Sequence, residues 1–337
     1  MTQASSATTS SLPDAPPIDG LRTRFLVDDT DYELVAELVR TSHEYDGIPW
    51  LPTADNLRLD MRHDGVDAAH DVVIVTLDDR LVAMTAVHRQ VRDGVPVYEV
   101  WGKVRPDLRR RRIGLWLFDW SVARARLRAA AEDPEDPVTL GAHAGEQEAG
   151  ARALYERAGL RPVRYFFLMR NARLADVEPV ALPPGLEIRP ITPDHYRAIY
   201  EAGNEAFRDH WESHEHGEEG FRQTFNQPDT NTDLWAVGWD GDQVAGVVEG
   251  WIWSEENRRL RLQRGWLERI SVRRPWRRRG LARALTAAAM IKLRDAGMAE
   301  AALGVDAENP TGALALYESL GFSVFRRSIA YRRPLER

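Results

Sequence analysis

The spacing of hydrophobic positions along the chain predicts alternating helices and strands. Leu34, Val35, Leu38 and Val39 share one face of a helix over residues 32–42. Apolar runs on both sides of short Asp-containing turns predict two hairpins, at residues 71–87 and 233–253. Helices and strands continue to alternate after each hairpin, which indicates an α/β (α+β) fold.

The predicted order of elements occurs twice in the chain. Three pairs of matching positions define the repeat: Val82-Ala83 with Val244-Ala245, Gly114 with Ala282, and Tyr155 with Tyr317. Their offsets are 162, 168 and 162 residues, and the differences fall in loops, where changes of length are tolerated. A tandem duplication is therefore predicted.

The domain boundaries follow from this repeat. Residues 1–20 are rich in Ser, Thr, Ala and Pro, and are predicted to form a flexible N-terminal tail. The first domain is expected over 21–172 and the second over 186–337. A linker at 173–185, marked by Pro183-Pro184, is expected between them.

A basic turn precedes a helix in the second copy. Arg277, Gly280 and Ala282 give the spacing R-x-x-G-x-A directly after a predicted strand. A helix that begins at this turn presents unpaired N–H groups and partial positive charge at its N-terminus. The small side chains allow an anion to approach the backbone, so the turn is predicted to hold a pyrophosphate.

A second helix follows the next strand. Asn309 is predicted to cap it, with Pro310 at its first position and Gly321 just after its last turn. Tyr317 is expected near the middle of this helix.

These two motifs resemble the coenzyme A site of the GNAT acyltransferases, and the two-copy arrangement is similar to that of mycothiol synthase and related tandem GNAT proteins. The resemblance implies two domains, each with a mixed, mostly antiparallel sheet flanked by helices. It also implies acetyl transfer from acetyl-CoA directly to a primary amine, without a metal. The coenzyme-binding residues that it implies are Ile270, Ser271, Val272, Arg277, Arg278, Arg279, Gly280, Leu281, Ala282 and Asn309.

Acyl transfer needs donors for the oxyanion, an acid for the thiolate and a base for the amine. A splayed strand end before Pro275 would expose the backbone N–H of Val272. Tyr317 is the candidate acid, or positions the sulfur. Glu268 and Glu249 are the candidate bases, and deprotonation through water is the alternative. Counting by twos places Glu268 on the same face as Ile270 and Val272.

The acceptor is expected at the loop that follows the first helix of the second copy. Asp209, His210 and Trp211 could hold an amine by charge and by an aromatic face. His214 and His216 also raise the possibility of a metal site, but a solvated loop is the favoured interpretation.

The first copy departs from this pattern. Arg112 stands where the second copy has Gly280, and Gln147 stands where it has Asn309. Because Arg adopts positive φ at a cost, the first copy is predicted to be a scaffold with weak or no coenzyme binding. The alternative is that the side chains of 109–112 still grip the pyrophosphate.

Composition limits the other classes. The 337 residues carry 45 Lys and Arg against 52 Asp and Glu, a net charge of −7, so neither nucleic acid nor membrane is a predicted partner. The absence of cysteine excludes disulfides and thiolate catalysis. No secretory signal or membrane span is evident, which predicts a cytoplasmic protein, and its oligomeric state stays open. The functional alternative is a non-catalytic acyl-CoA-binding or interaction protein.

Overall fold

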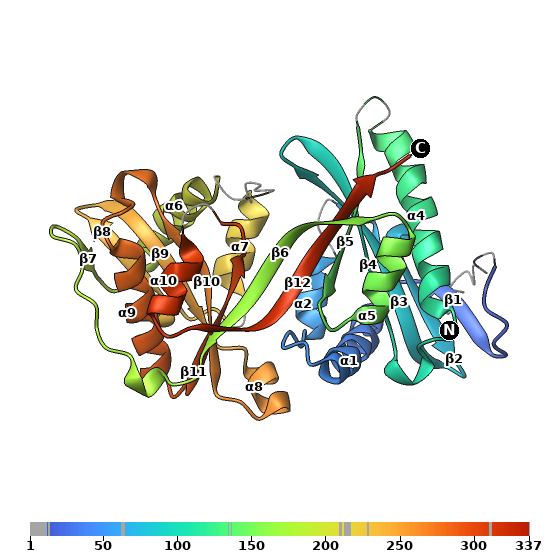
Figure 1. Cartoon of the computed structure of the whole chain (residues 1–337), viewed down its shortest axis with the longest axis horizontal. Coiled ribbons are helices and arrows are strands. Elements are labelled where there is room, and N and C mark those ends of the chain that lie inside the picture. Colours follow the sequence, from blue (N-terminus) through green and yellow to red (C-terminus); the bar gives the residue numbers. More distant parts are fainter. Residues whose placement is uncertain are drawn as a thin grey trace, which may run out of the picture. The chain divides into compact units, whose positions relative to one another are not determined.

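The computed structural model describes residues 12, 14–61, 65–133, 135, 137–208, 211, 217–227, 229–309 and 312–336. These residues form two compact units (Figure 1). Unit 1 comprises the chain up to Val163 together with the stretch from Ile329 onward, and unit 2 comprises Arg164–Ser328.

Unit 1 is a sheet with helices against it. Its strands run in the order β1-β2-β3-β4-β5, with bounds β1 Leu21–Phe25, β2 Val72–Leu77, β3 Arg80–Arg92, β4 Val95–Val104 and β5 Thr139–Gly145. Its helices are α1 Asp29–Asp46, α2 Ala54–Asp60, α3 Ala68–Asp71, α4 Ile113–Glu132 and α5 Ala149–Arg157, with a 3-10 turn η1 at Pro106–Leu108. Only β4 and β5 pair in parallel among the register pairs described for this unit.

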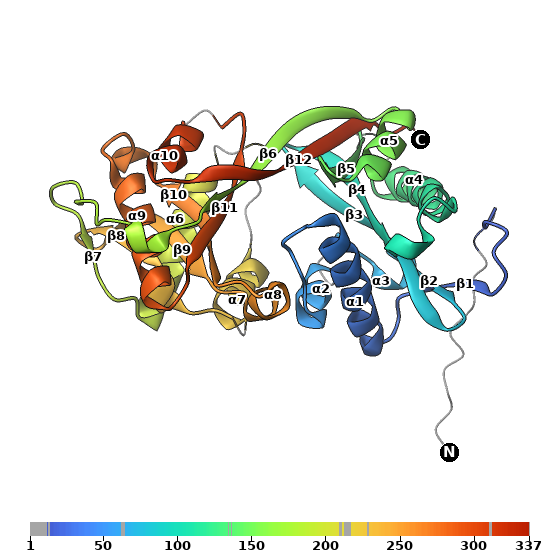
Figure 2. The ribbon, with the colours of Figure 1, turned by 60° about the horizontal axis from the view of Figure 1, so that its bottom comes forward.

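Unit 2 repeats this plan. Its strand order is β6-β11-β10-β9-β8-β7, with bounds β6 Arg161–Asn171, β7 Glu187–Ile188, β8 Ala236–Asp240, β9 Gln243–Trp251, β10 Arg264–Val272 and β11 Glu300–Asp306. Its helices are α6 Tyr196–Phe207, α7 Glu218–Asn226, α8 Ser254–Leu260, α9 Leu281–Asp295 and α10 Ala313–Ser319. Short 3-10 turns are η2 Leu174–Asp176, η3 Pro193–His195, η4 Thr232–Leu234 and η5 Arg274–Trp276. The mixed, mostly antiparallel sheet expected for each half is confirmed (Figure 2).

The two units exchange strands. The sequence predicts a first domain over 21–172, but residues from Arg164 onward belong to unit 2, where β6 pairs with β11. The last strand, β12 (Ser323–Pro334), begins in unit 2 and ends in unit 1. There Ile329 and Tyr331 join the core formed by α4, β4 and β5. An apolar pattern can indicate a strand but does not identify its neighbours in the sheet. The segment 173–185 lies within unit 2.

The two hairpins are confirmed, with a correction to their alignment. Leu77 pairs with Arg80 at the first turn, and Asp240 pairs with Gln243 at the second, an offset of 163 residues. The predicted match of Val82-Ala83 with Val244-Ala245 is therefore one residue out of step. The irregularities of register confirm the offset, because they fall at 75/76 in one hairpin and at 238/239 in the other.

None of the helices in the described part of the chain has the length and hydrophobicity needed to cross a lipid bilayer.

Candidate active site

Strands β10 and β11 run in parallel for a short distance and then separate. Their pairing joins Arg264–Leu267 to Glu300–Leu303 and ends there. Beyond this point β10 continues along β9, while β11 continues along β6 as far as Asp306. As expected, β10 ends before Pro275, at Val272, and Pro275 lies in η5, but β10 separates from β11 earlier, directly after Leu267.

A β-bulge in β10 lies at this divergence. Glu268 pairs with Glu249, and the next pair is Ser271 with Val247. Two residues of β10, 269 and 270, therefore lie opposite one residue of β9, 248. Arg269, inside the bulge, has a positive φ of 44°. Before the bulge, Glu268 and Glu249 lie directly opposite each other on one face of the sheet.

The bulge overturns the predicted alternation along β10. The sequence placed Glu268, Ile270 and Val272 on one face. In the structure Val272 pairs with Gly246, where an added Cβ would lie 3.2 Å from Leu285 of α9. Glu268 and its partner on β9 lie on the opposite face. The prediction was wrong because one inserted residue reverses the alternation of side chains.

Glu249 is the buried member of the glutamate pair, with 4% of its surface exposed. Trp251 Nε1 donates a hydrogen bond to its Oε2 at 3.3 Å, and Arg269 Nε lies 3.2 Å from its Oε1. Burial raises the pKa of Glu249 to about 7; Arg269 and Trp251 oppose this rise, and Glu268 adds to it. A carboxyl group with a pKa near neutrality can accept a proton under ordinary conditions.

Glu268 is the accessible member of the pair. Surrounding protein raises its pKa to about 7, against a hydrogen bond from Trp253 and the charge of Arg269. Its residue nevertheless keeps exposed surface, so water screens it and Glu249 is the more desolvated of the two. Trp251 and Trp253, which hold the two carboxyls, stack with ring centroids 5.2 Å apart.

The turn between η5 and α9 presents a concave run of backbone. Arg278 and Gly280 both have positive φ, of 59° and 86°. Helix α9 begins at Leu281 without a side-chain cap, so the N–H groups of its first turn face outward. The space around Gly280 is open, with nothing within 4 Å of a Cβ built there. Such a turn at a helix N-terminus fits a pyrophosphate group.

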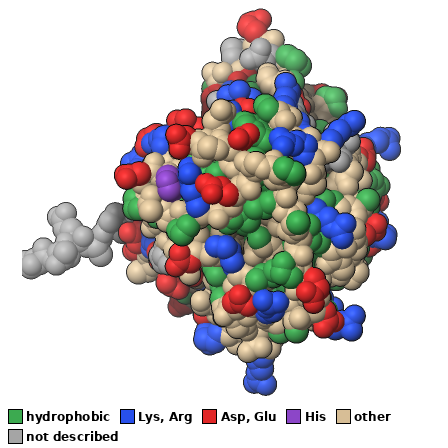
Figure 3. All heavy atoms as spheres, turned by 90° about the vertical axis from the view of Figure 1, so that its left-hand side faces the viewer, with side chains coloured by type: hydrophobic (Ala, Val, Ile, Leu, Met, Phe, Trp, Pro, Cys, Tyr) green, Lys and Arg blue, Asp and Glu red, His purple; other side chains and the backbone are tan. Residues whose placement is uncertain are grey.

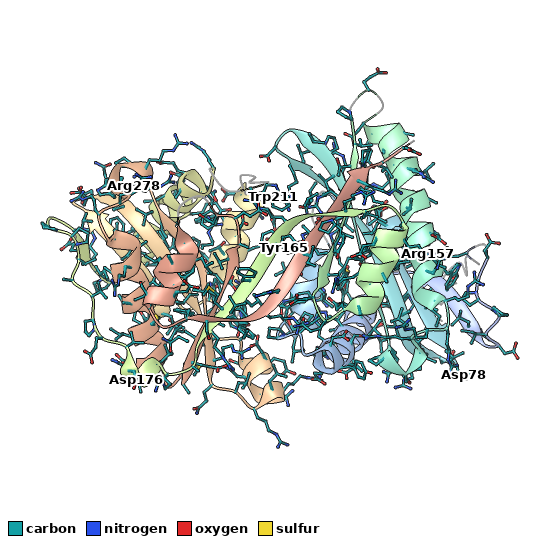
Figure 4. All side chains as sticks on the ribbon, in the orientation of Figure 1. Asp78, Arg157, Tyr165, Asp176, Trp211 and Arg278 are labelled. Atoms are coloured by element: carbon teal, nitrogen blue, oxygen red, sulfur yellow. The ribbon has the colours of Figure 1, made fainter. Side chains whose placement is uncertain are left out.

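The three arginines of the turn have different contacts. Arg277 Nε donates to the carbonyl oxygen of Val272 at 2.9 Å and its Nη2 to that of Ala206 at 3.2 Å. It therefore fastens the turn to the ends of β10 and α6. Arg278 and Arg279 are exposed, and Arg278 projects from the surface of unit 2 (Figure 4). Acidic and basic side chains are interspersed on the face drawn in Figure 3.

The remaining coenzyme candidates surround the same point. Leu281 packs its side chain in the core, so only its backbone faces the turn, and Ala282 is half-buried. Ile270 is half-buried in the bulge, whereas Ser271 is buried and its hydroxyl lies 3.4 Å from the carbonyl oxygen of Val247.

Tyr317 is buried in α10, with 5% of its surface exposed. Its ring lies edge-on to Phe322, with centroids 6.1 Å apart. Desolvation raises its pKa, so the neutral phenol is the form present near pH 7. The predicted helix end is confirmed: Gly321 has a φ of 80°, and Phe322 N–H returns to the carbonyl oxygen of Tyr317.

The predicted cap of this helix is wrong. Helix α10 begins at Ala313 with Gly312 at its N-cap, three residues beyond Asn309. The carbonyl oxygen of Asn309 instead accepts the N–H of Gly312 at 3.4 Å, as part of a turn. Pro310, predicted as the first helical residue, lies outside the described residues. Asn favours turns as much as caps, which the sequence pattern alone does not separate.

Of the acceptor candidates, Trp211 lies among the described residues. Its ring is 5.8 Å from that of Phe166 on β6, and the Arg164 guanidinium lies 5.6 Å from it. Asp209 and His210, like His214 and His216, lie outside the described residues. Figure 4 labels Trp211 together with Tyr165 of β6.

Comparison with known proteins agrees with this geometry. The Acetyltransferase (GNAT) family matches residues 196–322, which contain the turn, Tyr317 and the point where the parallel strands β10 and β11 separate, here called the wedge. A mycothiol acetyltransferase of Kocuria rhizophila is 33% identical over 310 residues, which cover 89% of this chain and 95% of that protein. The chain belongs to the GNAT acetyltransferase family.

Solved GNAT structures share the whole architecture. A GCN5-related N-acetyltransferase from Sphaerobacter thermophilus superposes with a TM-score of 0.70 at 28% identity, covering 95% of this chain and 97% of that one. A tandem GNAT protein from the clavulanic acid biosynthesis pathway has the same fold, with a TM-score of 0.68 at 17% identity and coverage of 94% and 99%. The tandem GNAT architecture is thereby confirmed. The chain is an acetyltransferase of a family that uses acetyl-CoA as cosubstrate.

The first GNAT copy keeps the backbone conformation of the turn that contains Arg278 and Gly280. Arg110 and Arg112 have φ of 65° and 67°, and α4 starts after Arg112 without a side-chain cap. Arg112 adopts a positive φ, as Gly280 does, at a cost of about 1–2 kcal/mol, so its side chain does not prevent this backbone conformation. Arg109 also repeats Arg277, with its Nε donating to the carbonyl oxygen of Val104 at 3.2 Å.

The wedge of the first copy lacks the carboxyl pair. With the corrected offset, Glu249 corresponds to Ala86, and Ala86 pairs across the hairpin with Trp101. Ala86 and Trp101 thus occupy the places of Glu249 and Glu268. Sequence comparison could have found this difference had the hairpins been aligned on their turns.

An ion pair joins the two sides of the same wedge. The parallel pairing of β4 with β5 ends at Val100 and Ala142. Beyond it, Lys103 Nζ of β4 lies 2.9 Å from Glu148 Oε1, which precedes α5, and both side chains are largely buried. In the second copy Ser271 takes the place of Lys103, 168 residues later.

Proposed function

We propose that the chain transfers the acetyl group of acetyl-CoA to a primary amine by direct attack, and that the reaction takes place in unit 2. One observation carries the proposal: the Glu249–Glu268 pair lies where β10 leaves β11, and the same strand leads through η5 to the turn of Arg278 and Gly280, whose backbone suits an anion. A proton acceptor and a coenzyme site thus belong to one strand and the turn that follows it.

The residues suit each step of such a transfer. Glu268, the accessible carboxyl, takes a proton from the ammonium group, directly or through water, and the free amine attacks the thioester carbon. The backbone N–H of Val272, beyond the bulge, is the candidate donor to the oxyanion. The carbon–sulfur bond then breaks, the attacking nitrogen loses its second proton as the amide forms, and the sulfur takes up a proton, so that coenzyme A leaves as the thiol. The raised pKa of Tyr317 favours a hydrogen bond to the departing sulfur over full release of its proton.

The acceptor belongs to this proposal as a class. The relatives named mycothiol acetyltransferase make the amine precursor of mycothiol the first acceptor to test. A carboxyl pair suits an acceptor that arrives as an ammonium ion, because the positive charge lowers the pKa of a neighbouring carboxyl group.

A thiol-release assay tests the proposal. Purified protein and acetyl-CoA are incubated with the mycothiol precursor, glucosamine, an aminoglycoside, spermidine and a peptide with a free N-terminus, each corrected for hydrolysis of acetyl-CoA. We expect release with at least one amine and formation of its N-acetyl product by mass spectrometry. Y317F serves as the matched variant and should retain acetyl-CoA binding while turning over more slowly. Binding of acetyl-CoA without turnover of any amine would favour a non-catalytic acyl-CoA-binding protein instead.

A further inference from the structure

Arg269 owes its position to the bulge in β10. In a regular strand the residue after Glu268 would point to the face covered by α9. The bulge, with its positive φ at Arg269, turns this side chain to the face that carries Glu249. A positive φ on a residue other than glycine costs about 1–2 kcal/mol, and such strain persists where surrounding contacts over-determine it.

The contacts that hold Arg269 come from two elements. Its Nε lies 3.2 Å from Glu249 Oε1 on β9, and its Nη2 donates to Asn204 Oδ1 of α6 at 2.9 Å. Its guanidinium carbon lies 5.6 Å from the ring of Tyr200 and 5.5 Å from the ring of Phe207. These distances place a fixed cation between α6 and the glutamate pair.

Helix α6 leaves room for this cation at one residue. A Cβ added at Gly203 would lie 2.9 Å from Arg269 Nη2, closer than side chains tolerate. Glycine in a helix interior costs about 1 kcal/mol relative to alanine. Gly203 therefore makes α6 less stable, but it leaves the space that the Arg269 guanidinium occupies.

A cation is needed at this position on electrostatic grounds. Like charges directly opposite each other across two strands are destabilising, and two close carboxyls resist ionising together. The charged groups that act on Glu249 are Arg269 and Glu268, both on β10. Tyr200 of α6 lies against Arg269, and Arg273 at the end of β10 is paired with Glu205 of α6 at 2.8 Å. Arg269 therefore supplies the positive charge that balances the pair.

We propose that Arg269 is a positioning residue for acetyl transfer: it balances the charge of buried Glu249 and thereby lets accessible Glu268 deprotonate beside it to serve as the base. The inference rests on the proposed function for its catalytic consequence. Its structural part, the charge balance, stands independently of any acceptor.

The first test reads the two carboxyls directly, without an acceptor. Protein labelled with ¹³C at the glutamate side-chain carboxyl is titrated by NMR, and E249Q and E268Q assign the two signals. In R269N, where asparagine tolerates positive φ, both midpoints should move upward, that of Glu249 by about one pH unit or more. R269K, which keeps the charge, should move them less. Unchanged midpoints in R269N would overturn the inference.

A second variant keeps the test decisive if R269N does not fold. N204A retains the charge and removes only the contact with α6, so the midpoint of Glu249 should move by less than in R269N. In the double variant R269N/E249Q no charge remains to be balanced at 249, so the midpoint of Glu268 should return toward its wild-type value. Failure of E249Q to restore it would show that Arg269 acts only by shaping the bulge.

The kinetic readout separates this inference from the proposed function. With an amine that the wild-type enzyme acetylates, the acidic limb of kcat/KM for R269N should move to higher pH, with activity recovering above the new midpoint. Affinity for acetyl-CoA, measured by calorimetry, should be unchanged. If no amine is turned over but the NMR midpoints move, the proposed function fails while the charge balance holds. A loss of activity that is equal at all pH values would contradict a role in balancing charge.

Discussion

The two GNAT copies share a scaffold and differ in the wall of one wedge. In unit 2, the strands that separate carry Glu249 and Glu268, each held by a tryptophan. In unit 1, Ala86 and Trp101 stand in their places, and Lys103 pairs with Glu148 across the opening. The strands also differ in register: β10 has one inserted residue opposite β9, whereas β4 pairs with β3 in one continuous register. The two copies thus share their strands but differ in the side chains and the register at this point.

The turns before α9 and α4 are alike in the two copies, unlike the strands at the wedge. Arg110 and Arg112 match the backbone of Arg278 and Gly280, so backbone conformation does not separate the copies. The prediction that unit 1 is a scaffold remains a prediction, and its support now lies in the wedge instead of in the φ of Arg112. The following predictions, from the largest effect to the smallest, would break or sharpen this comparison.

Removing the accessible carboxyl should have the largest effect. E268Q is expected to lower kcat/KM by about 10²- to 10⁴-fold, because a general base contributes that much. The assay is thiol release with an amine that the parent acetylates. W101F, at the matching place in unit 1, is the control and should leave kcat/KM unchanged. Equal losses in both variants would show that unit 1 also contributes to the chemistry.

The second-largest effect is expected when Gly280 is replaced by arginine, the residue at the matching position 112 of unit 1. G280R is expected to fold, because Arg112 also has a positive φ at the matching position, with a loss of stability of about 1–2 kcal/mol. Its side chain would cover the outward N–H groups, so acetyl-CoA affinity should fall by about tenfold or more, equivalent to 1.4 kcal/mol. Calorimetry measures the affinity, and G280A should lie between G280R and the parent. Unchanged affinity in G280R would remove Gly280 from the coenzyme site.

Replacing Arg277 or Arg109 should distinguish an effect on protein stability from an effect on acetyl-CoA binding. Hydrogen bonds to charged groups contribute about 1.5–3 kcal/mol, so R277A and R109A should both lower the free energy of unfolding. Only R277A is expected to raise the KM for acetyl-CoA, by several-fold, since it fastens the turn to Val272 and Ala206. Arg109 makes its bidentate contact with Asp46, at 2.7 and 2.8 Å. A raised KM in R109A would show that acetyl-CoA also binds unit 1.

The variant R112G is expected to have no effect on the number of acetyl-CoA molecules bound per chain. R112G restores glycine to the turn of unit 1 but leaves the Lys103–Glu148 pair across its wedge. We therefore expect R112G to bind one acetyl-CoA per chain, like the parent, by calorimetry. A second equivalent in R112G would place the defect of unit 1 in the turn. Two equivalents in the parent would show that unit 1 is no empty scaffold.

Local structure was largely predictable from the sequence. Helix α1, both hairpins, the turn at Arg278 and Gly280, and the helix end at Gly321 follow from apolar spacing and from glycine at positions with positive φ. The bulge at Arg269 could not be predicted, because a single inserted residue leaves no hydrophobic signal and yet reverses the face of Val272. The start of α10 was missed because Asn309 suits a turn as well as a cap.

The site was predictable as a list of residues more than as an arrangement. Glu249 and Glu268 were identified separately, as alternative bases, whereas the register makes them partners. Arg269 escaped notice because the alternation of a regular strand would point it away from both. Ala86 and Trp101 were missed because an alignment of hairpins that is one residue out of step compares the wrong positions.

The strand exchange sets the order in which the protein can be completed on the ribosome. Unit 2 is one continuous stretch, Arg164–Ser328, and all of it is synthesised before residues 329–335 emerge. The core of unit 1 is completed only after residues 329–335 have been synthesised, because Ile329, Tyr331 and Leu335 belong to it. Domains ordinarily fold N-terminal first during synthesis. Here unit 1 is synthesised first but its core is completed last. Until β12 has been made, the edge of β5 that β12 covers is exposed in the nascent chain and is open to pairing with other strands.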